Sequence, residues 1–314
     1  MSEPAVSVII PNYNGAHLLP TCLDSLRRQT FRDFATVVVD NGSADDSLGL
    51  LRSRYPEVQV VRLPRNLVFA GAVNEGIRRT ASEVVALLNN DTEADERWLE
   101  ELIKAQRAQP DYGWFASKLL LFDRRNIIHS AGDFYRLDGI PGNRGVWEED
   151  RGQYDTPGEV FGACGGAAAY RRAMLDDIGL FDEDLIGYCE DVDLNLRARL
   201  AGYRCYYVPT ARVYHRLSAT GGGPRASYLC GRNFVLVLAK DAPGAMLRRH
   251  WPRIVAAQVR LAAEALLHAR EPAARARLRG QAAALVALPR FLAKRRLVQS
   301  GRRVGDEEVL KALS

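Results

Sequence analysis

Short apolar runs alternate with amphipathic segments through the first third of the chain. Runs of β-branched and aliphatic residues at 6–10, 35–39, 58–63 and 84–88 have the length and composition of buried parallel strands. Apolar residues recur at helical spacing in the intervening and following segments, 18–29, 45–55, 70–79 and 96–106. This alternation of strand and helix predicts an α/β fold with a doubly wound, Rossmann-like mixed sheet.

The pattern is weaker between residues 112 and 245. Elements are expected there at 123–155 (irregular loops and a hairpin), 162–171, 204–208 and 211–214 (short strands) and 191–201 (a helix). From Pro243 onward the pattern is helical, and we expect breaks at Pro272 and Pro289. We therefore predict two domains, an α/β domain at 1–240 and a helical extension at 241–314.

Charge is distributed unevenly along the chain. Residues 246–303 hold 14 Lys and Arg against two acids, whereas residues 1–245 hold 28 basic and 33 acidic residues. Within the basic segment, one helical face carries apolar side chains and another carries arginines: Leu247, Trp251, Ile254 and Val255 against Arg249, Arg253 and Arg260. This is the pattern of an amphipathic helix that lies on an anionic membrane surface, and we predict peripheral membrane contact through 246–303.

Other interpretations of the basic segment stay open. Its helices could instead pack on the first domain or form a homodimer contact. Nucleic acid is not an expected partner, because the segment lacks the interleaved aromatic residues of a single-strand platform. The N-terminal residues have no cationic leader region, and no apolar run reaches the roughly 18 residues that span a bilayer. We expect a cytoplasmic protein, peripheral at the inner face of the cell membrane, with its five cysteines as free thiols.

Polar clusters follow three successive predicted strands. They are Pro11-Asn12-Tyr13-Asn14-Gly15, Asp40-Asn41-Gly42-Ser43 and Asn89-Asn90-Asp91. Ligands of open α/β sheets bind beyond the carboxyl ends of the strands, so these clusters should face one crevice. The sequence has neither a P-loop nor a G-x-G-x-x-G motif after the first strand, which disfavours ATP hydrolysis and dinucleotide chemistry. A bound diphosphate would then need a cation, and a carboxylate at a strand end is a natural ligand for one.

These motifs, taken in order, resemble family 2 glycosyltransferases of the GT-A fold. The resemblance covers about residues 5–240 and is carried by segments 6–15 and 39–45, by Arg65-Asn66, by Phe69-Ala70-Gly71 with Asn74, by Leu88-Asn89-Asn90-Asp91-Thr92, by Tyr188-Cys189-Glu190-Asp191-Val192-Asp193-Leu194 and by Val213-Tyr214-His215. The set is most similar to bacterial rhamnosyltransferase-type members that build cell-surface polysaccharide.

The resemblance implies roles for individual residues. Asp40 would accept a hydrogen bond from the pyrimidine of a UDP- or dTDP-sugar, and Tyr13 would cover the base. The other residues expected on the nucleotide are Pro11, Asn14, Asn41, Asn66, Asn74 and Asn90. A divalent ion, Mg²⁺ or Mn²⁺, would be held by Asp91 and His215 with Asn89. Two positions depart from the family pattern: Asn89 replaces an aspartate, and Val68 stands where many relatives have glycine.

The predicted activity is inverting transfer of a hexose or deoxyhexose, with L-rhamnose as one possibility, to a hydroxyl of a saccharide or lipid-linked acceptor. One general base is needed, and we assign it to Asp191 with Glu190 as the fallback. Asp193 should point away and pair with Arg197. The loop 129–152, with His129 and Trp147, is expected near the acceptor. The alternatives are a non-catalytic nucleotide-sugar or membrane-surface binding protein and a sugar nucleotidyltransferase. The latter needs a Gly-rich basic loop after the first strand that the sequence lacks.

Overall fold

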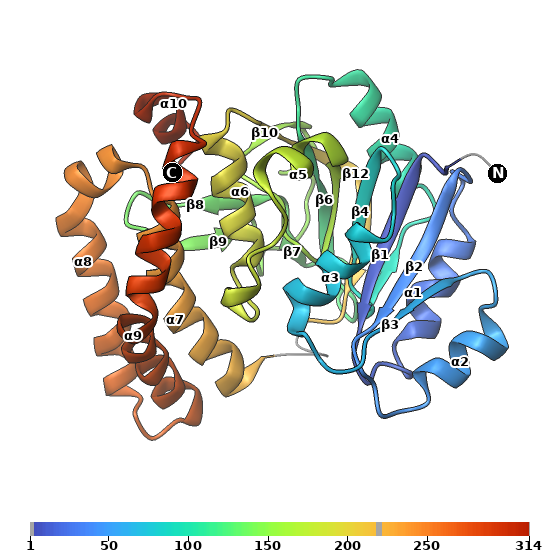
Figure 1. The fold of residues 1–314 in the computed structure, drawn as a ribbon, viewed down its shortest axis with the longest axis horizontal. Helices are drawn as coiled ribbons and strands as arrows, with labels where there is room; N and C mark the ends of the chain where they lie inside the picture. The colour runs from blue at the N-terminus through green and yellow to red at the C-terminus, as the bar shows by residue number, and fades with distance from the viewer. Residues whose placement is uncertain (1–2, 218–221, 314) are drawn as a thin grey trace.

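The computed structural model describes residues 3–217 and 222–313, so the extreme ends of the two predicted domains lie outside the described residues (Figure 1). The strands are β1 (Val6–Asn12), β2 (Phe34–Asp40), β3 (Gln59–Arg62), β4 (Val84–Leu88), β5 (Thr92–Ala94), β6 (Trp114–Leu121), β7 (Ile128–Ser130), β8 (Asp133–Tyr135), β9 (Pro141–Asn143), β10 (Gly158–Val160), β11 (Ala167–Arg171) and β12 (Cys205–His215). The helices are α1 (Leu19–Arg27), α2 (Ser47–Arg54), α3 (Val68–Arg78), α4 (Trp98–Ala108), α5 (Arg172–Ile178), the 3₁₀ helix η1 (Glu183–Leu185), α6 (Glu190–Leu200), α7 (Gly223–Asp241), α8 (Gly244–Leu267), α9 (Pro272–Ser300) and α10 (Asp306–Lys311).

A mixed sheet runs through the body of the molecule in the order β10-β12-β6-β11-β4-β1-β2-β3. The strands β3, β2, β1 and β4 are parallel to their neighbours, whereas β11 runs antiparallel between β4 and β6. The predicted doubly wound mixed sheet is confirmed. A separate hairpin, β8–β9, lies within the predicted loop-rich region 123–155.

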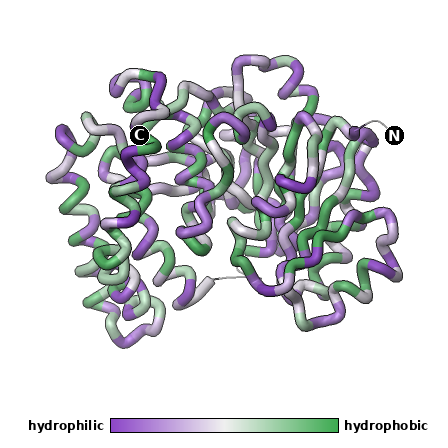
Figure 2. The backbone as a smooth tube through the Cα atoms, viewed as in Figure 1, coloured by the Kyte–Doolittle hydropathy of each residue, from purple (hydrophilic) through white to green (hydrophobic). Residues whose placement is uncertain are grey.

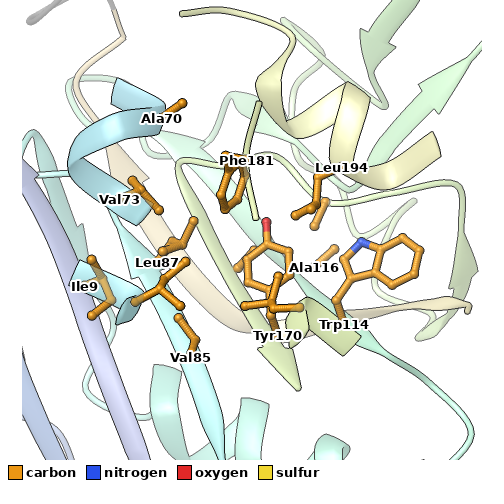
Figure 3. Close-up of a cluster of buried hydrophobic side chains, with 14 of the residues drawn as sticks. Ile9, Ala70, Val73, Val85, Leu87, Trp114, Ala116, Tyr170, Phe181 and Leu194 are labelled. Carbon is orange, nitrogen blue, oxygen red and sulfur yellow. The ribbon is translucent and has the colours of Figure 1, made fainter. Parts of the chain in front are cut away.

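Each face of the sheet is buried under helices because successive strand residues point to opposite sides. Ile9, Val85 and Leu87 pack toward α3, together with Ala70 and Val73 of that helix (Figure 3). On the other face, strand residues such as Val8 and Ala86 pack against α1 and α4. Gly76 permits the close approach of α3, since a Cβ there would lie 2.5 Å from Ile9 Cγ2.

Two elements of the body differ from the sequence prediction. The central strand β6 was not predicted, because its lysine hides an otherwise apolar run. Lys118 is fully buried and its ammonium lies 2.7 Å from carboxylates of Asp150 and Asp155. The two short strands expected at 204–208 and 211–214 are one strand, β12, with a register shift between Val208 and Arg212. Pro209 lacks an N–H and interrupts the ladder there without ending the strand.

The helices α7, α8 and α9 form a bundle beside the sheet (Figure 1). The long helix α7 was not predicted, and it packs along α9. The predicted break at Pro289 is wrong, since α9 continues through it. Both Pro289 and Leu285, whose carbonyl loses its partner, are exposed, so water can satisfy that carbonyl.

The bundle and the body share one hydrophobic cluster. Leu185, Val192 and Leu196 of the body contact a set of bundle residues that includes Val237 and Phe291. Figure 2 shows that α8 and α9 alternate between hydrophobic and hydrophilic segments along their length. Among residues 3–217 and 222–313, none of the helices combines the length and apolar content that crossing a membrane requires.

Candidate active site

The polar clusters predicted at the strand ends meet at one edge of the sheet. Asn12 and Asp40 are register partners at the ends of β1 and β2. The Asn12 amide donates to Ser47 Oγ (3.1 Å), and its carbonyl accepts from the Asn90 amide (2.8 Å). Gly15 lies against the same pair, since a Cβ there would be 2.3 Å from both Asn12 Oδ1 and Asn90 Nδ2. Hydrogen bonds between side chains therefore join the ends of β1 and β4 to the start of α2.

Asp40 presents an unsatisfied acceptor at this edge. Its side chain is buried, its Oδ2 accepts weakly from the Ser43 N–H at 3.4 Å, and Oδ1 has no hydrogen-bond partner among the described residues. An unsatisfied buried carboxylate oxygen is costly, so it marks a place where a ligand donor would be favourable. Tyr13, on the loop after β1, keeps 48% of its surface exposed. Pro11 lies at the end of the same strand, and the Asn14 carbonyl accepts from the Ala44 N–H (2.8 Å).

Asn41 and Asn66 shape the loop that precedes α3. The Asn41 amide donates to Asn66 Oδ1 and to the Val68 carbonyl, both at 3.0 Å, and its own carbonyl accepts from the Leu67 N–H (2.7 Å). Val68 has φ of +58°, in the region where β-branched residues are strained. This explains structurally why a glycine suits that position.

Asn74 is occupied by the protein itself. Its amide donates to the Phe181 carbonyl and to Glu183 Oε1, both at 2.9 Å, and its carbonyl accepts from the Phe181 N–H (3.0 Å). The side chain is almost completely buried. It therefore links α3 to the segment that leads into η1.

The residues expected at the metal lie beside a histidine pair. His215 Nε2 lies 3.1 Å from Asp91 Oδ1, and His215 Nδ1 lies 3.1 Å from His129 Nδ1. Burial and then the neighbouring His215 lower the pKa of His129 to about 3. Asn89 Oδ1 is buried with no hydrogen-bond partner among the described residues. No group of three or more His, Cys, Asp or Glu suited to a metal occurs in the part of the chain that the structure describes.

This donor set fits a divalent ion that takes further ligands from a diphosphate. Asp91 and His215 offer one carboxylate and one imidazole, and Asn89 adds an amide oxygen that the protein leaves unsatisfied. Mg²⁺ in particular is bound through one or two carboxylates and substrate phosphates.

The segment Gly165–Gly166 connects this end of the site to Asp191. The Gly165 N–H donates to Asp191 Oδ2 (2.9 Å), and the Gly166 carbonyl accepts from the Asn89 N–H (3.0 Å). A Cβ on Gly166 would contact Asn89 Nδ2 and His215 Cε1 at 3.6 Å. A continuous set of contacts thus runs from Asp40 through Asn12 and Asn90 to Asp91 and on to Asp191.

Glu190 and Asp191 begin α6 in different environments. Asp191 accepts from the N–H groups of Gly165 and Val192, whereas Glu190 Oε2 has no partner among the described residues. Burial raises the pKa of Asp191, and those two N–H groups oppose the rise. Burial and then the Asp191 charge raise the pKa of Glu190 to about 8. When the pair holds one proton, that proton therefore resides on Glu190, and Asp191 remains the ionised carboxylate.

Strained backbone precedes this pair. Ile186, Tyr188 and Cys189 all have positive φ, of +70°, +62° and +68°. Residues in this region persist only where the surroundings enforce them. Asn233 of α7 does so, because its buried amide donates to the carbonyls of Leu185 (2.8 Å), Gly187 (2.9 Å) and Tyr188 (2.8 Å). Asn233 was not predicted as a functional residue, since no helix was predicted around it.

Asp193 takes no part in the cleft. Its Oδ2 accepts from Arg197 Nε (2.8 Å), as predicted, and its Oδ1 contacts the Lys240 ammonium. Burial works to raise the pKa of Asp193, but Lys240 and Arg197 outweigh it and hold the pKa below its ordinary range. A further buried carboxyl that no motif signalled, Asp133, accepts from Asn143 Nδ2 (2.7 Å). Burial and the Asp191 charge hold the pKa of Asp133 well above its ordinary value.

Comparison with known proteins gives the same assignment. Residues 7–179 match the family model described as glycosyl transferase family 2. The chain is 31% identical to the O-antigen biosynthesis protein RfbC of Myxococcus xanthus, over 69% of this chain and 18% of that protein. It is 26% identical to an N-acetylglucosaminyl-diphospho-decaprenol L-rhamnosyltransferase of Mycobacterium tuberculosis, over 72% of this chain and 80% of that protein. It spans only about a quarter of another relative, an uncharacterised protein of Sinorhizobium fredii.

Two solved structures share the fold. The mannosyltransferase PcManGT from Pyrobaculum calidifontis, in complex with GDP-Man and Mn²⁺, aligns with a TM-score of 0.56 and 20% identity over 99% of this chain and 86% of that one. GalNAc-T7 with UDP, GalNAc and Mn²⁺ aligns with a TM-score of 0.60 and 20% identity over 76% of this chain and 49% of that one. At this identity the likeness concerns the fold. With a family model matching more than half its length, the chain belongs to glycosyl transferase family 2 and has the GT-A fold.

Proposed function

We propose that this protein is an inverting glycosyltransferase that moves a hexose or deoxyhexose from a UDP- or dTDP-sugar to an acceptor hydroxyl. The observation that carries the proposal is the position of Asp191. Two backbone N–H groups hold its carboxylate, and one of them belongs to Gly165, next to the glycine that contacts Asn89 and His215. A proton acceptor therefore lies beside the proposed diphosphate end of the cleft.

The nucleotide is assigned to the β1–β2 side of the cleft. Asp40 Oδ1, buried and unsatisfied, would accept the N3–H of uracil or thymine, and exposed Tyr13 would cover the base. Pro11, Asn14 and Asn90 would line the nucleoside and phosphates. The hydrogen bonds of Asn41, Asn66 and Asn74 favour a supporting role, in which they fix the loop before α3 and the segment before η1.

In the proposed reaction Asp191 accepts the proton of the acceptor hydroxyl as that oxygen attacks the anomeric carbon. The bond from that carbon to the diphosphate oxygen breaks on the opposite face, which inverts the configuration, and the nucleoside diphosphate leaves. Asp91, His215 and Asn89 would hold a divalent ion, which when bound neutralises charge on the leaving diphosphate. Glu190 keeps its own proton near neutral pH, since its pKa is raised to about 8, and would donate a hydrogen bond toward the acceptor.

The similarity to a rhamnosyltransferase and to an O-antigen biosynthesis protein supports a deoxyhexose donor such as dTDP-L-rhamnose and an acceptor on the way to cell-surface polysaccharide. A lipid-linked saccharide suits this assignment. A non-catalytic binding protein and a sugar nucleotidyltransferase are both less favoured. The residues proposed to bind the donor, to act as the base and to hold the metal all lie along one connected edge of the sheet.

Thermal unfolding with a panel of UDP-, dTDP- and GDP-sugars, each with and without Mg²⁺ or Mn²⁺, tests the proposal. A ligand that binds only the folded state raises the melting temperature by mass action. We expect a metal-dependent rise with one pyrimidine sugar nucleotide. The absence of any rise across the panel would contradict the proposal.

A further inference from the structure

The outer face of α8 is apolar and uncovered. Trp251, Val255, Val259 and Leu266 are 61%, 52%, 60% and 62% exposed, and Leu267 at the end of the helix is 83% exposed. The spacing of the first four places them on one side of the helix. Ile254 and Ala257, on the neighbouring side of the helix, are buried, so the apolar face predicted from the sequence is only partly exposed. We call Trp251, Val255, Val259, Leu266 and Leu267 the apolar stripe.

Arginines without acidic partners border the apolar stripe. Arg270, Arg275 and Arg279 follow the stripe through the turn into α9, whereas Arg253 lies on another side of α8, since it is two residues away from both Trp251 and Val255. None of these four forms an ion pair with any residue in the described ranges 3–217 and 222–313; Arg275 donates only to the carbonyls of Ala269 and Arg270.

Cations elsewhere in the bundle behave differently. Arg290 pairs with Asp184 (2.6 Å), and Lys294 pairs with Asp184 (2.6 Å) and with Asp182. Arg303 pairs with Asp177 of α5. The basic residues that face the body are therefore paired with its acids, and Arg248, Arg249 and Arg260 of α8 also have acidic partners, whereas Arg270, Arg275 and Arg279 at the turn form no ion pair with a described residue. The remaining positive charge is concentrated where the apolar surface is exposed.

The turn between α8 and α9 lies at the same end of the molecule as the cleft. α7 and α9 run side by side in the same direction: Gly231 packs on Arg277 in their first halves, and the Arg295 and Gln299 side chains donate to the carbonyls of Ala239 and Asp241 near their ends. The start of α9 is thus level with the start of α7 (Figure 1). There the backbone of Gly222 interacts with the side chain of Tyr188, two residues before Glu190.

We propose that the apolar stripe, with the arginines that border it, docks the protein on an anionic lipid bilayer. The apolar side chains would enter the headgroup boundary while the arginines bind lipid phosphates. A second copy of the chain is a poorer occupant, because it would bring an equally cationic surface against this one. The inference rests on the proposed function in one respect: docking at this end presents the cleft to an acceptor anchored in the same membrane.

Vesicle flotation tests the proposal. The full chain is mixed with phosphatidylcholine vesicles with and without phosphatidylglycerol, at low and high salt. We expect binding only with the anionic lipid, and weaker binding at high salt. Val255→Glu/Val259→Glu and Arg270→Glu/Arg279→Glu should each reduce binding by about tenfold or more. Matched controls on the body, Val60→Glu on exposed β3 and Arg52→Glu on α2, should bind like the original protein.

Two results of the flotation experiment would contradict membrane docking. Flotation that is independent of anionic lipid, or that both double variants retain, would overturn the proposal. Light scattering on the double variants gives a further test. Variants that still bind vesicles but change their oligomeric state would also overturn the proposal, because the stripe would then contact a second copy of the chain. The thermal response to sugar nucleotides is recorded on the same variants. In the original protein, donor binding without flotation would contradict this inference alone, whereas flotation without donor binding would contradict the proposed function alone.

Discussion

The sheet-containing body and the helical bundle of α7–α9 expose apolar side chains for different reasons. In the body, exposed Tyr13, Ile186 and Tyr188 lie on the loops that precede α1 and α6, which also carry the candidate site. In the bundle, exposed apolar residues follow one side of α8 toward the arginines of the turn, and others, such as Leu285 and Val286, lie on α9. The bundle thus has two surfaces: an inner one, which pairs with acids of the body and holds the loop before Asp191 through Asn233, and an outer one, which no described residue covers.

The largest expected effect belongs to the body. Asp191→Asn keeps the shape of the side chain and removes the proton acceptor, so turnover of the sugar nucleotide should fall by roughly 10²-fold or more with donor binding unchanged. Asp176→Asn, an exposed carboxyl on α5, is the matched control. A steady-state assay of nucleoside diphosphate release measures the turnover of both variants. Near-normal turnover in Asp191→Asn would move the base to Glu190.

The second prediction tests whether the bundle helps to position the catalytic loop before Asp191. Asn233→Leu removes the amide that holds three carbonyls of the strained loop, which should destabilise the protein by about 2–4 kcal/mol and also reduce turnover. Gln281→Leu, whose amide contacts only Gln258, should do neither. Urea unfolding and the turnover assay report both effects. Full activity in folded Asn233→Leu would mean that the body positions Asp191 alone.

The third prediction concerns pH. Glu190 keeps its proton in the folded protein up to about pH 8, whereas its ordinary pKa is 4.5. The folded state therefore binds an extra proton between these values, and Glu190 weakens folding as pH rises through that window. Glu190→Gln should gain stability relative to the original protein over the same window, by up to a few kcal/mol. Unfolding curves from pH 4.5 to pH 8 check this, and a stability difference that does not vary with pH would refute it.

The smallest expected effect is a change in stability that comes from local backbone strain at Val68. Val68→Gly should stabilise the protein by about 0.5–1 kcal/mol, because φ of +58° suits glycine and strains valine. Val60→Gly, in the extended strand β3, should destabilise by a comparable amount. Thermal unfolding compares the two. A loss of stability in Val68→Gly would show that packing of the valine outweighs its backbone strain.

The sequence predicted the body better than the bundle, for physical reasons. Fully apolar strands such as β1 and β4 have a local signature, and so do polar residues at their ends. β6 was missed because Lys118 is neutralised by Asp150 and Asp155, which are more than thirty residues away along the chain. Pro289 was misjudged because the cost of a proline depends on whether water reaches the freed carbonyl. The division into 1–240 and 241–314 stays a prediction; α7 packs on α9 across it.

The motifs were sufficient to predict which residues form the candidate site. They did not predict which contacts hold those residues in place. No local pattern shows that Asn74 is used by Phe181 and Glu183, or that Asn233 fixes the loop before Asp191. These contacts join segments more than forty residues apart. Likewise, Asp133 became visible only when folding brought it near Asp191.

Calorimetric titration of UDP, dTDP and GDP in the presence of Mg²⁺, into the original protein and into Asp40→Asn, tests the central claim most directly. The account predicts that a pyrimidine diphosphate binds the original protein more tightly than GDP does. It also predicts that Asp40→Asn weakens that binding by about tenfold or more, because an acceptor buried without a protein partner is lost. Equal binding of GDP, or unchanged pyrimidine binding in Asp40→Asn, would contradict it.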